Sequence, residues 1–212
     1  MKKDIAYKYI KQQILNGEWK TDSAINVNQI MDELSLSRTP VNKALRQLEY
    51  EGFLNIIPQV GVFVKRPDAQ EVYERLLVCV RLDAYMTGIG ASKISEEKIR
   101  ELEELLEVMD NPELTSDQYA QLNVDFHSAI IYSSGLEYMI QMTKQLWDYL
   151  NYVTTPTELF LEEVRRRSQT EHWMILQTLK DRDVDMATKM MEKHMGRVAE
   201  FVKGSLENIY ST

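Results

Sequence analysis

The chain has 212 residues, 44% of them hydrophobic, and a formal net charge of -8. This length and apolar content allow one large core or two smaller ones, and we expect two domains. No run of about eighteen apolar residues occurs, and the first residues, MKKDIAYKYIKQQ, lack the apolar stretch of a signal peptide. These features argue against a membrane-spanning protein and predict a soluble protein of the cytoplasm.

Charge is distributed unevenly along the chain. Residues 1–66 hold ten Lys and Arg against seven Asp and Glu, a net +3, whereas residues 67–212 hold fifteen against twenty-six, a net -11. A basic head on an acidic body suits approach to a polyanion such as DNA. The single cysteine, Cys79, excludes an intrachain disulfide framework and a cysteine-based zinc cluster, which fits a reducing compartment.

Two helices are predicted before residue 36. Apolar residues recur every four positions at Ala6, Ile10 and Ile14, and this first helix should end near Asn16 and Gly17. The second, shorter helix has an inward face of Ile30, Met31 and Leu34.

A third helix is predicted to follow after about four residues, which is the spacing of a helix-turn-helix. Ser37 can cap its free amides and Pro40 fits its first turn. Its buried stripe is predicted to be Val41, Leu45 and Leu48.

Two short strands are predicted next, over residues 53–57 and 62–64, and residues 58–61 join them as a hairpin. A hairpin directly after a helix-turn-helix would form a wing.

Residues 14–64, ILNGEWKTDSAINVNQIMDELSLSRTPVNKALRQLEYEGFLNIIPQVGVFV, closely resemble the DNA-binding domain of the GntR superfamily. The resemblance implies a winged helix-turn-helix whose recognition helix begins near Arg38 and lies in the major groove. The N-terminal amides of that helix would face a phosphate, and Arg38 would reach a guanine edge or the backbone.

The sequence departs from this resemblance at three positions, because family members commonly carry arginine where the chain has Asn28, Asn42 and Val60. Asparagine can still recognise adenine, and Lys43 and Arg46 can contact phosphates. We therefore expect an atypical operator and a shallow salt dependence of DNA affinity. The alternative is a winged helix that has become a protein-interaction module. The predicted DNA-binding residues are Asn28, Arg38, Thr39, Asn42, Lys43, Arg46 and Gly61.

Residues 67–69 are expected to be a linker to a helical domain over 70–212. Helices are predicted over residues 70–93, 95–110, 116–133, 136–153, 157–182 and 183–208, separated by turn signals. Six such helices would form an antiparallel bundle. The expected fold class is mainly α, with a winged helix-turn-helix over residues 1–66 followed by this bundle.

All three histidines of the chain, His127, His172 and His194, lie in the predicted bundle on its third, fifth and sixth helices. Asn123 is four residues before His127 and shares its helix face. Imidazoles converging from three helices suit Zn²⁺ or Ni²⁺. Spacing alone leaves open that they are unrelated, hydrogen-bonded side chains.

The segments NVDFHSAI (123–130) and SQTEHWMILQTLKDRDVDMATKMMEKH (168–194) resemble the FCD effector domain of the FadR branch, and the six predicted helices are more similar to its VanR-type subgroup. The usual metal motif there is Asp-x-x-Phe-His with two later histidines. The resemblance therefore implies a divalent metal, zinc or nickel, on His127, His172 and His194, with Asn123 at the aspartate position. An amide oxygen is a weaker ligand than a carboxylate, so metal affinity is expected to be reduced.

The resemblance also implies a small carboxylate effector bound at the metal. Arg165 and Ser168 precede His172 by seven and four residues and share its side of the helix, so either can bind such a carboxylate. The alternative is that Arg165 belongs to a solvated run of arginines.

We predict a homodimer that presents two winged helices to a pseudo-palindromic operator and changes its operator affinity when the effector binds. The resemblance implies a repressor that the effector releases. Two alternatives remain open. A metal-dependent hydrolase would need a general base, and no matching catalytic motif accompanies the histidines. A metal-free regulator would use Asn123 and the histidines to bind the effector directly.

Overall fold

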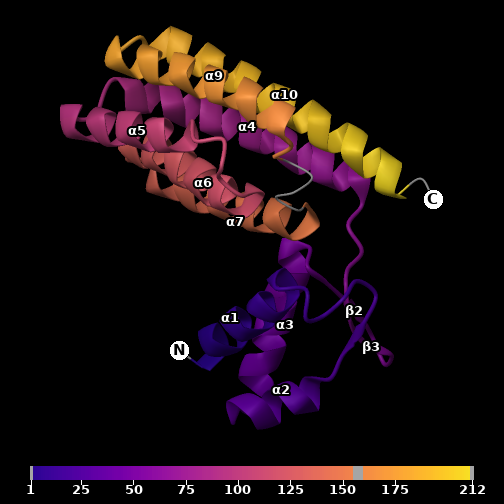
Figure 1. The fold of residues 1–212 in the computed structure, drawn as a ribbon. Coiled ribbons are helices and arrows are strands. Elements are labelled where there is room, and N and C mark those ends of the chain that lie inside the picture. Colours follow the sequence, from indigo (N-terminus) through magenta and orange to yellow (C-terminus); the bar gives the residue numbers. More distant parts are fainter. Residues whose placement is uncertain (1, 155–159, 211–212) are drawn as a thin grey trace. The chain divides into compact units, whose positions relative to one another are not determined.

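The computed structural model describes residues 2–154 and 160–210 (Figure 1). The chain divides into two compact units. Unit 1 comprises Met1–Asp68 with Asn151–Val153, and unit 2 comprises Ala69–Leu150 with Thr154–Thr212.

Unit 1 contains three helices and a small sheet. The elements follow in the order α1 (Lys2–Leu15), β1 (Ala24–Ile25), α2 (Val27–Leu34), α3 (Arg38–Glu51), β2 (Leu54–Ile57) and β3 (Gly61–Val64). The sheet order is β1-β3-β2 with antiparallel neighbours. The predicted helix-turn-helix and wing are thereby confirmed. The sequence patterns did not predict β1, because a strand of two residues has no measurable alternation.

Local signals explain where these helices begin and end. Gly17, just beyond α1, and Gly52, at the end of α3, have φ of 72° and 93°, a left-handed conformation that glycine adopts without strain. The Asn26 side chain caps α2 by accepting from two backbone amides. The cap predicted at Ser37 is wrong in its chemistry: Ser37 precedes α3, but its side chain makes no capping hydrogen bond.

The core of unit 1 follows the predicted apolar stripes. The inward apolar residues of α1 and α3 are at most 1% exposed. In α2 only Ile30 is buried, whereas Met31 and Leu34, also predicted to face inward, are half-buried. The full set of such side chains is Ala6, Ile10, Ile14, Ile30, Val41, Ala44, Leu45 and Leu48. Burying one face of each helix fixes which residues of α3 point to solvent.

All the regular secondary structure described in unit 2 is helical (Figure 1). Its helices are α4 (Ala69–Ala91), α5 (Glu96–Met109), α6 (Ser116–Ser133), α7 (Glu137–Val153), α9 (Glu162–Lys180) and α10 (Val184–Tyr210). The mainly α fold class is confirmed. The predicted start of the fifth helix at residue 157 lies outside the described residues, and α9 is described from Glu162.

Helix α4 packs along α10 and also against α6 and α9. Glycines permit the closest approaches: a Cβ at Gly88 would lie 2.1 Å from Thr188 Oγ1 of α10, and one at Gly90 would lie 3.0 Å from the carbonyl oxygen of Ile130 in α6. A larger residue at either position would force the helices apart.

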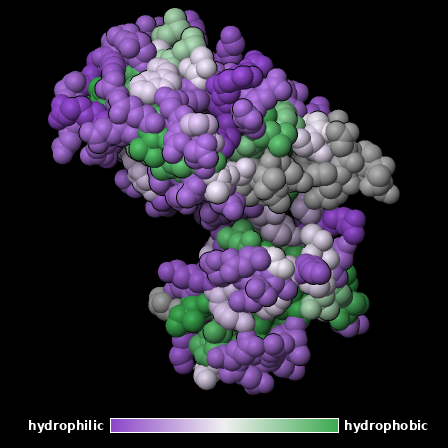
Figure 2. All heavy atoms as spheres, viewed as in Figure 1, coloured by the Kyte–Doolittle hydropathy of each residue, from purple (hydrophilic) through white to green (hydrophobic). Residues whose placement is uncertain are grey.

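Hydrophilic side chains cover most of the molecular face drawn in Figure 2, and apolar side chains reach it in smaller patches. Among the described helices, none is long and apolar enough to cross a membrane.

Candidate functional site

The exposed side of α3 carries most of the predicted DNA-binding residues. Thr39, Asn42, Lys43 and Arg46 are exposed and line one open pocket. They share this pocket with Lys3 from α1, which the sequence analysis did not single out because it lies outside the helix-turn-helix. A polar and cationic surface of this kind fits a phosphate backbone.

Arg38, the first residue of α3, is held by a residue of α2. Its Nη2 donates to Asn28 Oδ1 over 2.8 Å, and both side chains are exposed. The structure thus brings together two predicted DNA contacts as a pair. Arg46 donates to Glu49 over 3.0 Å, so part of its charge is offset within the helix.

The wing residues lie at the hairpin turn. Gly61 begins β3 with φ of 158°, and Val60 just before it is 68% exposed. An exposed apolar side chain at a wing tip can contact a groove without adding charge.

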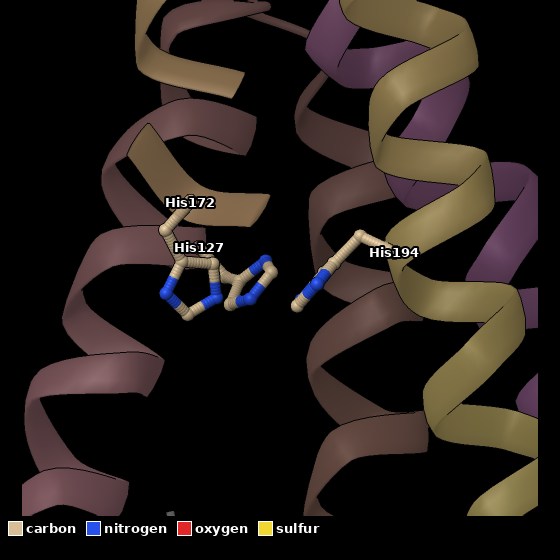
Figure 3. A group of neighbouring side chains, drawn as sticks. All are labelled: His127, His172 and His194. Atoms are coloured by element: carbon tan, nitrogen blue, oxygen red, sulfur yellow. The ribbon is translucent and has the colours of Figure 1, made fainter. Parts of the chain in front are cut away.

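The three histidines converge inside unit 2 (Figure 3). His127 comes from α6, His172 from α9 and His194 from α10, and all three are at most 4% exposed. One ligand nitrogen from each lies within 4.8 Å of the others. Separate helices therefore place three imidazoles at one buried point, as predicted.

Two of these rings are oriented by neighbouring side chains. His194 Nδ1 lies 2.7 Å from a Glu171 carboxylate oxygen, and His172 Nδ1 lies 3.4 Å from Gln169 Oε1. An imidazole that donates from Nδ1 presents the lone pair of Nε2. His172 Nε2 is buried without a hydrogen-bond partner among the described residues, as is His127 Nδ1.

The surroundings keep the imidazoles neutral. Burial lowers the pKa of His127 to about 3, with a smaller contribution from His194. Burial also lowers the pKa of His172, assisted by the two other histidines and Arg197. The pKa of His194 is lowered by burial as well, although its hydrogen bond to Glu171 opposes the shift. Neutral, oriented imidazoles with unpartnered buried nitrogens fit a divalent metal ion.

Glu171 connects the cluster to Arg197, a partly buried cation. Burial opposes its ionisation, but hydrogen bonds from His194 and Arg197 outweigh this and lower its pKa to about 2. The Arg197 Nε and Nη2 atoms both donate to the carboxylate, at 2.7–3.0 Å. Sequence reasoning did not identify Arg197, although its position three residues after His194 places it on nearly the same face of α10.

The predicted effector residues have different surroundings. Arg165 Nη1 donates to the Leu114 carbonyl over 2.8 Å, and its guanidinium lies 4.6 Å from the Tyr119 ring centroid. Ser168 is buried and accepts from Arg197 Nη2 over 2.8 Å. Geometry therefore ties Ser168 to the histidine cluster through Arg197, whereas Arg165 fastens α9 to the segment before α6.

Asn123 lies one turn before His127 on α6 and is half-buried. Asp125 is exposed and accepts from Gln121 over 3.0 Å. The nearby carboxylate is thus engaged at the surface.

A second buried acid was missed by the sequence analysis. Asp83 of α4 is fully buried, and neither of its oxygens has a hydrogen bond of good geometry among the described residues. Burial raises its pKa to about 7, opposed only by the nearby Trp147 side chain. The Trp147 and His127 ring centroids are 6.4 Å apart, so Trp147 lies close to both Asp83 and the cluster.

Comparisons with known proteins agree with both units. Residues 2–64 match the bacterial regulatory proteins of the gntR family, and residues 74–197 match the FCD domain. The Nta operon transcriptional regulator of Aminobacter aminovorans is 23% identical over 193 residues, which cover 88% of this chain and 90% of that protein.

Two further relatives come from Escherichia coli. The HTH-type transcriptional repressor GlaR is 21% identical and covers 89% of this chain and 90% of its own length. The solved structure of McbR/YncC shares 21% identity, with a TM-score of 0.70 over 97% of this chain and 99% of that one. At this identity the structural likeness shows the fold. The family matches together span most of the chain, which therefore belongs to the GntR family of transcription regulators and carries an FCD domain.

Proposed function

We propose that this regulator is a cytoplasmic homodimer that represses transcription until a small carboxylate effector binds at a divalent metal in its FCD domain. The observation that carries this proposal is the convergence of three buried, neutral imidazoles from α6, α9 and α10. Burying polar atoms without partners costs stability in a protein interior, and a bound metal ion would be the partner of these nitrogens.

DNA binding is assigned to the exposed side of α3 and its neighbours. Arg38 and Asn42 are proposed to contact base edges, while Thr39, Lys43 and Arg46 contact phosphates. The wing residue Gly61 would approach the backbone closely because it carries no side chain. Two such surfaces in a dimer would engage two half-sites of one operator.

The metal would be held by His127, His172 and His194, with Asn123 supplying an oxygen. When bound, zinc or nickel would supply a positive charge that attracts an anionic oxygen ligand. Glu171 would keep His194 in the metal-binding tautomer, and Gln169 would orient His172.

Arg197 is proposed to position the effector carboxylate, together with Ser168. It is partly buried beside the cluster and already donates to both Glu171 and Ser168. Since Glu171 offsets its charge, the metal supplies the net positive charge of the site. Arg165 donates to a carbonyl and lies over an aromatic ring, so it would hold α9 in place and would not contact the effector.

Switching requires that the effector bind one arrangement of the helices more tightly than another. The proposed site draws on α6, α9 and α10, so ligand contacts can change how these helices pack on each other. The direction of control, repression, is supported by GlaR, whose name describes it as a repressor.

The test uses untagged full-length protein, so that no affinity metal is introduced. Metal content is measured by mass spectrometry, and an operator is selected from random duplex DNA. The proposal expects about one zinc or nickel per chain and a selected sequence whose binding is lost in Arg38→Ala. Operator binding with an effector response but no metal would support direct binding by the histidines and Asn123, and metal-dependent hydrolysis without operator selection would support an enzyme.

A further inference from the structure

The contact between α2 and α3 at the tip of the recognition helix joins two exposed side chains. Arg38 Nη2 donates to Asn28 Oδ1 over 2.8 Å, and the residues are ten positions apart in the chain. Because arginine only donates, the oxygen end of the Asn28 amide must face it. Among the described residues, this is the single hydrogen bond of the Arg38 guanidinium.

Asn28 is itself held firmly. It is the second residue of α2, and its backbone N–H donates to the capping side chain of Asn26 over 3.1 Å. The same cap fixes the amide of Gln29, and Ile30, two residues after Asn28, is buried. Asparagine has only two side-chain torsions, so its oxygen is a well-placed acceptor once the backbone is fixed.

An exposed arginine ordinarily samples many rotamers, and ordering it on binding costs conformational entropy. The hydrogen bond to Asn28 removes part of this cost before DNA arrives. A guanidinium has five N–H donors, and a guanine edge accepts from two of them. Four donors therefore remain after the contact with Asn28, enough for a bidentate contact.

We propose that Asn28 is a positioning residue that orients Arg38 toward one guanine and thereby sets base preference at one position of each half-site. This inference rests on the proposed operator binding. Asn28 carries no charge, so its role can be separated from phosphate attraction. Losing Asn28 should weaken the preference for guanine and leave the number of displaced counterions unchanged.

The experiment selects binding sites from random duplex DNA with full-length wild type, Asn28→Ala, Asn28→Asp and Arg38→Ala. Wild type is expected to prefer guanine strongly at one half-site position, and Arg38→Ala to lose that preference. Asn28→Ala should weaken it about tenfold at the same position, since a bidentate contact accounts for about 1–3 kcal/mol of discrimination. Asn28→Asp keeps an acceptor for Arg38 and should retain the preference while binding all DNA more weakly.

Gln29→Ala is the matched control, because it removes an exposed amide from the same helix that bonds to Glu33 and not to Arg38. Thermal unfolding of each variant checks folding. The inference is overturned if Asn28→Ala and wild type select the same base frequencies, or if the change falls at a position that Arg38→Ala leaves unaffected. Failure of wild type to select any sequence overturns the proposed operator binding itself, which is a different result.

Discussion

At the scale of single residues, the molecule contains buried polar groups whose placement costs stability. Asp83 is the clearest, since its carboxylate is fully buried and has no hydrogen bond of good geometry among the described side chains. Such a group destabilises the folded state whenever it is ionised.

Asp83→Asn is expected to change how stability depends on pH. Folding raises the pKa of Asp83 from its ordinary value to about 7, so wild type loses stability as pH rises from about 4 through 7 and no more above that. The variant lacks this loss and should gain roughly 2–4 kcal/mol relative to wild type over that range. Urea unfolding at a series of pH values measures it, with Asp125→Asn as an exposed control. Parallel curves for variant and wild type would contradict the assignment.

Glu171→Gln is expected to weaken metal binding. The amide keeps an acceptor for His194 but loses the negative charge that strengthens the Nδ1 hydrogen bond and pairs with Arg197. Loss of such an orienting carboxylate lowers metal affinity about 10–100-fold. Competition with a chelator gives the zinc affinity, and Glu163→Gln on the exposed part of the same helix is the control. Equal affinities for variant and wild type would show that Glu171 does not orient a ligand.

At the scale of elements, glycine decides how closely α4 and α10 approach. Gly88→Ala should destabilise the protein by about 1–3 kcal/mol, because the new Cβ would lie 2.1 Å from Thr188 Oγ1 and 3.1 Å from the Val184 carbonyl oxygen. Thr188→Ala in the same protein should recover part of the loss. Gly196→Ala is the control, since nothing lies within 4 Å of its added Cβ, and it should stabilise by up to about 1 kcal/mol. Urea unfolding compares them, and equal effects at both glycines would contradict the close packing.

Most elements could be predicted because their signals are local. The apolar stripes of α1 and α3 and the stop at Gly17 lie within one or two helical turns of sequence. The strand β1 could not be predicted from the sequence, because its two residues are identified as a strand only by their pairing with β3. The cap at Ser37 was predicted from residue type, and the structure shows that the side chain makes no such bond.

The candidate sites were predicted unevenly for the same reason. The histidines were found through a motif, and the structure confirms that they converge. Glu171 and Arg197 were missed because their partners lie on other helices, and Asp83 was missed because a buried acid without a hydrogen bond has no sequence signal. A periodic sequence pattern predicts which face of a helix a residue occupies. It does not predict which side chain of another helix contacts that residue.

At the scale of the whole molecule, affinity for DNA should depend only moderately on salt. If Lys3, Lys43 and Arg46 each neutralise one phosphate, a dimer displaces counterions at about six phosphates, for a log–log slope of about -5. Lys3→Ala should make the slope shallower by about two and leave base preference unchanged. Equilibrium binding at several salt concentrations gives the slope, with Lys8→Ala as an exposed control on the same helix. A slope unchanged by Lys3→Ala would remove α1 from the DNA contact.

The central claim is that ligand binding at the histidine cluster changes operator affinity. Fluorescence anisotropy of the selected operator, with zinc-loaded full-length protein and a panel of small carboxylates, tests it most directly. At least one carboxylate is expected to weaken operator binding about tenfold. Chelation of the metal or the substitution His172→Ala should abolish this response without abolishing DNA binding. Operator binding that no carboxylate alters, in wild type or in His172→Ala, would contradict it.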